Sequence, residues 1–246
     1  MPSHRSMEAL VEEQARRSRL LHEGDEARRS FHFHDEPRGG EAQPVITVSR
    51  QYGAGGGDVA RRVADELRLV LYDRELIHRI AEDAHETERV VSALDEKDRE
   101  VLTDWMVAFA SDHYLGLTGY RQHLARVVTT LAASGGAVIL GRGAHFILGE
   151  RAAFRVSVVA PLDHRVETVR RREGLSDRKA RQRIQQVDAE RKAFLTRLFR
   201  ADTSDPAHFD LVLNTAVLGV GGAVEAVRAG VGAFRRPAVA TGVAAG

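Results

Sequence analysis

The sequence predicts an α/β fold in which helices cover both faces of a parallel sheet. From Pro44 onward, short apolar runs alternate with longer amphipathic segments, and this alternation is typical of such folds. The first apolar run leads into a cluster of four glycines, Gly53 and 55–57, which a helical pattern follows directly. Parallel sheets of this kind bind ligands at the carboxyl ends of their strands, so we expect the functional site there.

The predicted elements follow one another in a regular order. Five apolar runs predict strands, at 45–49, 69–73, 137–141, 154–160 and 211–215. The first helix is predicted over 58–67, because Val59, Val63 and Leu67 repeat every four residues along one face. Helical patterns are also predicted at 75–84, 87–97, 100–114, 119–133, 162–173, 176–199 and 221–234.

Composition and segment boundaries predict one soluble domain with two flexible ends. We divide the 246 residues into a leader (1–43), an α/β domain (44–234) and a tail (235–246). The chain is 43% hydrophobic and 29% charged, it has no stretch that we expect to cross a membrane, and its start lacks the apolar centre of a secretory signal. We therefore expect a cytoplasmic protein. The lack of cysteine excludes disulfides, thiolate catalysis and cysteine-ligated metals.

The stretch SRQYGAGGGDVARR (49–62) predicts an anion site between a strand and a helix. N–H groups at a helix start and the helix dipole favour a phosphate there. The common phosphate loop GxxxxGK[ST] does not fit. With Gly55 as its second glycine, Arg50 stands in place of the first glycine, Gly56 in place of the lysine and Gly57 in place of the hydroxyl residue.

Two readings of this turn remain open. In one, Arg50 at the strand end supplies the missing positive charge from the other side of the loop, since a guanidinium matches phosphate oxygens. In the other, the glycines form a flexible turn and Arg50 pairs with a carboxylate such as Asp58.

Several stretches together resemble the cytidylate kinase-like family, a branch of the P-loop nucleoside monophosphate kinases. In order, they are ITVSRQYGAGGGDVARRVADEL, LYDRELIHRIAED, AVILGRGAHFIL, RVSVVAPLDHRVETVRRREGLSDRKARQRIQQVDAERKAFLTRLF and FDLVLNT. The resemblance covers about residues 44–230. It implies a P-loop NTPase fold with three α/β/α layers, a five-stranded parallel sheet, a helical acceptor-binding insertion at about 75–134 and an arginine-bearing lid at about 174–200.

The resemblance also implies an activity and the residues that perform it. The activity is transfer of the γ-phosphoryl group of ATP to a pyrimidine nucleoside monophosphate, CMP or dCMP. The donor-phosphate loop is Gly53, Ala54, Gly55, Gly56, Gly57 and Asp58. The acceptor-binding residues are Asp73, Arg79, Arg142 and Asp188, and the residues that act on the transferring group are Arg50, Arg191 and Arg197. No residue is assigned to a metal, and we expect ATP and water to hold Mg²⁺.

Some positions leave alternatives open. Gly143 stands where the family has the aspartate that accepts from the cytosine amino group, so base specificity does not carry over. Arg79 is equally well explained as a solvated helix position. Asp188 and Arg191 share a helix face, where they would also form an ordinary ion pair. We interpret His145 as a structural residue.

Three other functions are compatible with the sequence. A kinase for another small acceptor would fit Gly143, and a nucleotide-binding regulatory module without turnover would fit the missing lysine. RNA binding through 165–200, where twelve Lys or Arg stand against five Asp or Glu, is least favoured, because only Phe194 and Phe199 offer stacking surfaces. We expect small-molecule nucleotides as partners, no membrane, and a possible homodimer contact through the long helical middle, 87–134.

Overall fold

Five parallel strands form one sheet in the computed structural model, which describes residues 43–82, 120–202 and 205–234. The strands lie in the order β2-β3-β1-β4-β5, so β1 is central. Their bounds are β1 (Val45–Arg50), β2 (Val70–Tyr72), β3 (Ala137–Leu140), β4 (Phe154–Val159) and β5 (Leu211–Asn214). All five predicted strands are confirmed to within one residue at either end.

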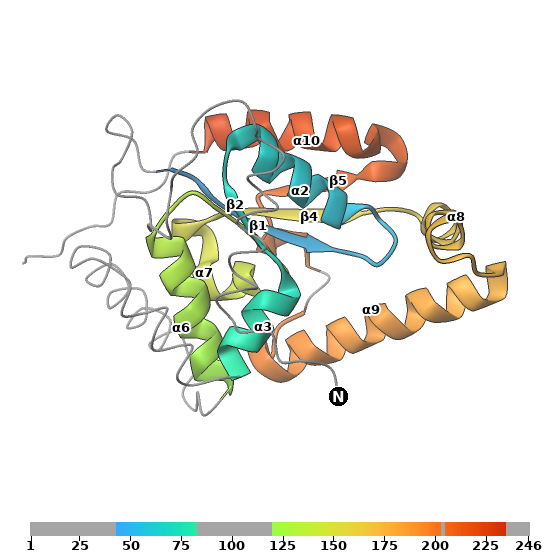
Figure 1. The fold of residues 1–246 in the computed structure, drawn as a ribbon, viewed down its shortest axis with the longest axis horizontal. Coiled ribbons are helices and arrows are strands. Elements are labelled where there is room, and N and C mark those ends of the chain that lie inside the picture. Colours follow the sequence, from blue (N-terminus) through green and yellow to red (C-terminus); the bar gives the residue numbers. More distant parts are fainter. Residues whose placement is uncertain (1–42, 83–119, 203–204, 235–246) are drawn as a thin grey trace, which may run out of the picture.

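Helices cover both faces of the sheet (Figure 1). One face carries α2 (Gly56–Leu67) and α10 (Thr215–Ala233), and the other carries α3 (Arg74–Glu82), α6 (Tyr120–Ala133) and α7 (Ala144–Ala152). Beyond the carboxyl ends of the strands, α8 (Leu162–Glu173) and α9 (Asp177–Phe199) form a hairpin, followed by the short helix η1 (Pro206–His208). The predicted three-layer α/β/α architecture with a five-stranded parallel sheet is confirmed, and a glycine-rich turn joins its central strand to a helix, as in P-loop NTPases.

Alternate residues of β1 enter the two cores on either side of the sheet. Val45 packs with α6 and α7, whereas Ile46 and Val48 pack with α2 and α10. Side chains of a strand alternate between its faces, and both faces here are buried, which explains the continuous apolar run in the sequence. This double burial fixes the end of β1, and therefore the glycine turn, in the middle of the sheet's carboxyl edge.

The helix α10 is longer and more apolar than the sequence reading expected. It begins at Thr215 rather than 221 and is interrupted at Gly219, where φ is 64°. By length and composition alone, with a mean hydropathy of 1.3, it is a candidate membrane span that the sequence analysis did not single out. In the fold it packs against α2 and the sheet through Ala223, Val224 and Val227.

Several predicted features lie outside the described residues. These are the leader 1–43 apart from its last residue, the helices predicted at 87–97 and 100–114, and the tail 235–246. The proposed dimer contact falls largely on the same middle segment, and it stays a prediction.

Candidate active site

Steric contacts explain why the turn after β1 needs glycines. Gly53 and Gly55 have φ of 81° and 75°, a region that favours glycine. A Cβ at Gly53 would also lie 2.9 Å from the carbonyl oxygen of Arg165. A Cβ at Gly57, in contrast, would meet nothing within 4 Å. The turn is thus pressed against α8 on one side and open at the start of α2.

Unpaired backbone donors gather in this turn. Within the described part of the chain, the N–H groups of Gly53, Gly55, Gly56 and Gly57 have no hydrogen-bond partner. They lie at the start of α2, where the helix dipole adds positive potential. Several such N–H groups in one turn, together with a helix start, bind phosphate oxygens in many proteins. The turn therefore has the donors that a polyphosphate requires.

The remaining loop residues have defined roles. Ala54 is buried, its N–H donates to the Gln51 carbonyl at 3.3 Å, and its carbonyl accepts from Thr215 Oγ1 at 2.8 Å. Asp58 pairs with Arg61 at 3.3 Å and with Arg172 from α8. Its carboxylate is therefore engaged with surface arginines, and the alternative that Asp58 neutralises Arg50 is wrong.

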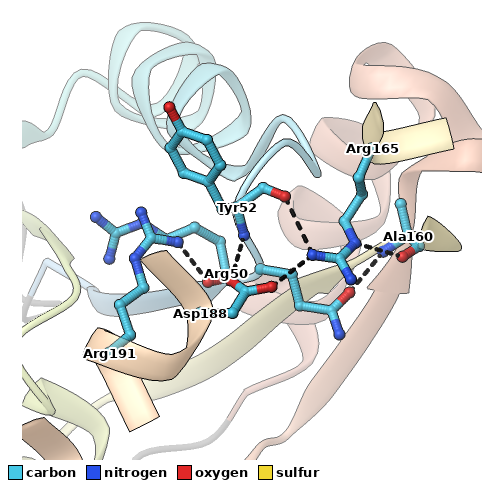
Figure 2. Close-up of polar contacts among 7 residues, drawn as sticks. Arg50, Tyr52, Ala160, Arg165, Asp188 and Arg191 are labelled. Atoms are coloured by element: carbon cyan, nitrogen blue, oxygen red, sulfur yellow. Dashed lines mark hydrogen bonds and ion pairs between the residues drawn. The ribbon is translucent and has the colours of Figure 1, made fainter. Parts of the chain in front are cut away.

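Two side chains from the α8–α9 hairpin hold the loop in place (Figure 2). The N–H of Tyr52 donates to Asp188 Oδ1 at 2.9 Å. The buried Arg165 donates through Nη1 to Asp188 Oδ2 at 2.6 Å and to the Tyr52 carbonyl at 3.3 Å, and through Nε to the Ala160 carbonyl at 3.1 Å. Both carboxylate oxygens of Asp188 thus bind protein donors. The structure gives Asp188 this positioning role, and its predicted contact with the acceptor stays a prediction.

Four guanidinium groups gather at the carboxyl ends of β1 and β3. Arg50 ends β1, Arg74 begins α3, Arg142 follows β3 and Arg191 comes from α9. Burial lowers the pKa of Arg50 to about 9, and the charges of Arg191, Arg74 and Arg142 contribute to this lowering, against an opposing effect of Asp73. Two carboxylates, Asp73 and Asp188, act on these four cations, so the cluster keeps an excess of positive charge that attracts an anion.

Arg191 is the member of this cluster that also contacts the backbone at the start of the loop. Its Nη1 donates to the Arg50 carbonyl at 3.1 Å, and its guanidinium lies 5.4 Å from the centre of the Tyr52 ring (Figure 2). Burial lowers its pKa. Its Nε is buried without a partner among the described residues. Buried donors are rarely left unpaired, so this Nε has a hydrogen bond still to be made.

Arg142 sits in an uncommon backbone conformation that aims it at the cluster. Gly141, Arg142 and Gly143 have successive φ of 85°, 53° and 71°. Arg142 Nε donates to the Arg74 carbonyl at 3.2 Å, and its guanidinium lies 4.9 Å from the centre of the Phe194 ring. A Cβ at Gly143 would overlap the ring of Phe199. The aspartate that the family pattern has at this position therefore does not fit beside Phe199.

Other predicted residues fall in different surroundings. Asp73 accepts from the N–H of Glu75 at 2.9 Å and faces the charge of Arg50. Arg197 is exposed and stands six residues after Arg191 on α9, about 120° around the helix, so the structure does not bring it to the cluster. The side chain of Arg79 is outside the described residues.

Arg74 and Arg165, two arginines of this site, were not predicted from the sequence. Arg74 adjoins Asp73, and Arg165 follows β4 by six residues, so their positions after strand ends were a usable signal. Arg181, which we did not assign to the site, pairs with Asp163 and Asp177, each at 2.8 Å, as a surface residue.

His145 is buried, with no hydrogen-bond partner for its Nε2 among the described residues, and its structural role stays a prediction. Its Nδ1 lies 3.1 Å from Ser49 Oγ, and its ring packs on Phe146 and Phe209. Burial lowers its pKa from 6.5 to about 3, with smaller contributions from the charges of His208 and Arg155. His145 is therefore neutral at physiological pH.

This low pKa predicts an acid-sensitive contribution to stability. In the unfolded chain His145 binds a proton as the pH falls below 6.5, whereas in the folded protein it does so only near pH 3. Between these two pH values the free energy of unfolding therefore falls by about 1.4 kcal/mol for each pH unit of acidification. In His145→Gln, the loss in unfolding free energy between pH 7.5 and pH 5 should be smaller by about 2 kcal/mol. Urea titrations at the two pH values measure it, and equal losses in both proteins would contradict the buried neutral state.

The described residues do not build a magnesium site. Mg²⁺ prefers oxygen ligands, but the loop has glycine where phosphate loops usually have a hydroxyl. No group of three or more His, Asp or Glu that could hold a metal occurs in the described parts of the chain. The donor set here is cationic, so it fits phosphate oxygens and not a metal ion.

Comparison with known proteins agrees with this geometry. The sequence profile of the Cytidylate kinase-like family matches residues 45–217. Cytidylate kinase from Ignicoccus hospitalis is 26% identical over 184 residues, covering 75% of this chain and 96% of that protein. Cytidylate kinase from Methanopyrus kandleri is 26% identical over 186 residues, covering 70% and 84%.

A solved structure shares the fold. An uncharacterized protein from Eubacterium ventriosum matches with a TM-score of 0.60 at 20% identity, covering 78% of this chain and 99% of that one. The profile match runs from the first residue of β1 into the start of α10, and so includes the glycine loop and all four clustered arginines. This chain therefore belongs to the cytidylate kinase-like family.

Proposed function

We propose that this protein is a kinase that transfers the γ-phosphoryl group of ATP to a small acceptor bearing a phosphate group. The observation that carries the proposal is the juxtaposition of four unpaired loop N–H groups with the cluster of Arg50, Arg74, Arg142 and Arg191. A polyphosphate would satisfy the donors and neutralise the cations together. CMP and dCMP are the first acceptors to test, because the named relatives are cytidylate kinases.

The proposed reaction needs positioning and charge more than covalent help. A phosphate oxygen of the acceptor forms a bond to the γ-phosphorus while the bond from that phosphorus to the β–γ bridging oxygen breaks, leaving ADP. The loop N–H groups hold the donor phosphates, Arg50 and Arg191 neutralise charge on the transferring group, and Arg74 and Arg142 hold the acceptor phosphate. Arg79 is a further proposed acceptor contact. Magnesium bound to ATP would supply additional positive charge.

The start of α10 offers a place for the donor base. Thr215 bonds to the loop carbonyl of Ala54, and a Cβ at Gly55 would lie 3.4 Å from Val220. Close by in sequence, Val217 is 80% exposed and Leu218 is 42% exposed. We propose that the adenine lies against these apolar side chains.

Charging this surface should weaken ATP binding selectively. Val217→Asp is expected to raise KM for ATP by about tenfold, in line with about 1–2 kcal/mol of lost apolar burial, and to leave kcat nearly unchanged. Steady-state kinetics with varied ATP measure the effect. An unchanged KM for ATP in Val217→Asp would show that the adenine does not lie against Val217.

One assay tests the proposed function and its rivals. The purified protein is incubated with magnesium, ATP and a panel of monophosphates while ADP is measured. ADP that depends on CMP or dCMP supports the first acceptor class, and dependence on another acceptor supports a kinase of different specificity, which the crowding of Gly143 by Phe199 favours. ATP binding without turnover supports a regulatory module, which glycine at the lysine position favours. A cytoplasmic location and self-association stay predictions.

A further inference from the structure

The side chain of Arg50 occupies the space that a residue at position 56 would need. A Cβ at Gly56 would overlap Cβ of Arg50 and lie 3.1 Å from its Cγ and 3.2 Å from Cβ of Val158. Gly56 does not have a positive φ and begins α2, so the backbone itself would accept a side chain there. The obstacle to a side chain at position 56 is therefore Arg50.

The other end of Arg50 lies against Gly141. A Cβ at Gly141 would overlap Nη1 of Arg50 and lie 3.2 Å from Cζ. The arginine thus extends from the glycine loop to the end of β3, where it joins the cluster. Among the described residues it forms no ion pair, although Asp73 acts on its charge.

The loop departs from GxxxxGK[ST] at both position 50 and position 56. That pattern has glycine first and lysine seventh, and the lysine reaches the β- and γ-phosphates. Here the first position is Arg50 and the seventh is Gly56. The overlap at Gly56 links the departures, because a side chain fits at only one of the two positions.

We propose that Arg50 and Gly56 are a reciprocal exchange of the usual glycine and lysine, so that the phosphate-binding cation comes from the end of β1 instead of the start of α2. This inference rests on the proposed function for its ligand, a nucleoside triphosphate. In this proposal Arg50 has the role of the phosphate-loop lysine, which explains why the loop needs no lysine at position 56.

The exchange predicts opposite effects with and without ligand. In the free protein Arg50 is a partly buried cation among Arg74, Arg142 and Arg191, so replacing it with methionine, which keeps part of the stem, should raise the melting temperature. ATP and tripolyphosphate should raise the melting temperature of the natural protein and have little effect on Arg50→Met. A melting temperature that rises equally with polyphosphate in both proteins would overturn the inference.

A swap of the two residues is the decisive experiment, with ATP affinity measured by calorimetry. Arg50→Gly should weaken ATP binding at least about tenfold, and Arg50→Gly with Gly56→Lys should return it to within about threefold of the natural protein. Gly56→Lys alone should lower the melting temperature, because Arg50 still fills the space. The matched control is Arg50→Gly with Gly57→Lys, which adds the same charge one position away and should remain as weak as Arg50→Gly.

The outcomes separate this inference from the proposed function. Equal affinities of the two double variants, or an Arg50→Gly protein that binds ATP normally, would overturn the exchange even if the natural protein is an active kinase. Recovery of binding on adding Gly56→Lys to Arg50→Gly, with no turnover of any acceptor by the natural protein, would support the exchange and contradict the kinase proposal. A natural protein that binds neither ATP nor tripolyphosphate would overturn both.

Discussion

Replacing Arg191 with methionine is expected to lower the rate of phosphoryl transfer by about 100- to 1000-fold while the protein stays folded. Its guanidinium holds the Arg50 carbonyl at 3.1 Å and has a buried Nε with no partner among the described residues, so it can donate to the transferring group without first breaking a protein contact. Loss of such a donor falls mainly on kcat, because the charge it stabilises develops in the transition state.

Single-turnover kinetics and circular dichroism together check this prediction. Arg178→Met is the matched control, because Arg178 is an exposed residue of the same helix and should retain activity within about twofold. A kcat for Arg191→Met near that of the control would remove Arg191 from the reaction. An unfolded variant would be replaced by Arg191→Lys, for which we expect a smaller loss of kcat.

Replacing Arg165 with methionine is expected to lower the free energy of unfolding by about 2–4 kcal/mol. Arg165 is 9% exposed and donates to two backbone carbonyls and to Asp188, so in the variant three acceptors lose their hydrogen-bond donor. The partly buried Asp188 would keep only its bond to the Tyr52 N–H. We expect the loop to loosen, with weaker ATP binding as a result.

Denaturant titrations measure the loss in unfolding free energy, and a double-mutant cycle of Arg165 and Asp188 shows how much of it comes from their ion pair. Asp188→Asn keeps an oxygen for the Tyr52 N–H while removing the charge, so the coupling energy between the two substitutions isolates the ion pair. A loss below about 0.5 kcal/mol for Arg165→Met would show that the loop is held by other contacts.

The sequence predicted the sheet and the glycine turn because both depend on local patterns. β1 and β3 are buried on both faces, which leaves continuous apolar runs in the sequence, and the left-handed backbone at Gly53 and Gly55 requires glycines. The family resemblance added the P-loop architecture on the same segments.

The roles of individual arginines and of Asp188 were harder to predict. Arg165 and Asp188 are tied to Tyr52 by contacts across 113 and 136 residues, and no local pattern contains that information. Arg197 and Arg191 point to different sides of α9, which could have been predicted from the sequence because it follows from helical periodicity. The overlap between position 56 and Arg50 depends on the relation between a strand end and the following helix, so it appears only in three dimensions.

The two attachments between α9 and the loop couple their movements. Asp188 accepts a hydrogen bond from the Tyr52 N–H, and Arg191 donates one to the Arg50 carbonyl. Asp188 and Arg191 are three residues apart on α9, and the two backbone groups that they bind are two residues apart. A ligand that tightens the backbone of 50–57 must therefore also restrain the middle of α9. By thermodynamic reciprocity, a change that stabilises this part of α9 also raises the affinity of the loop for its ligand. Ligand binding to the loop is therefore expected to slow amide hydrogen exchange near residues 188–191.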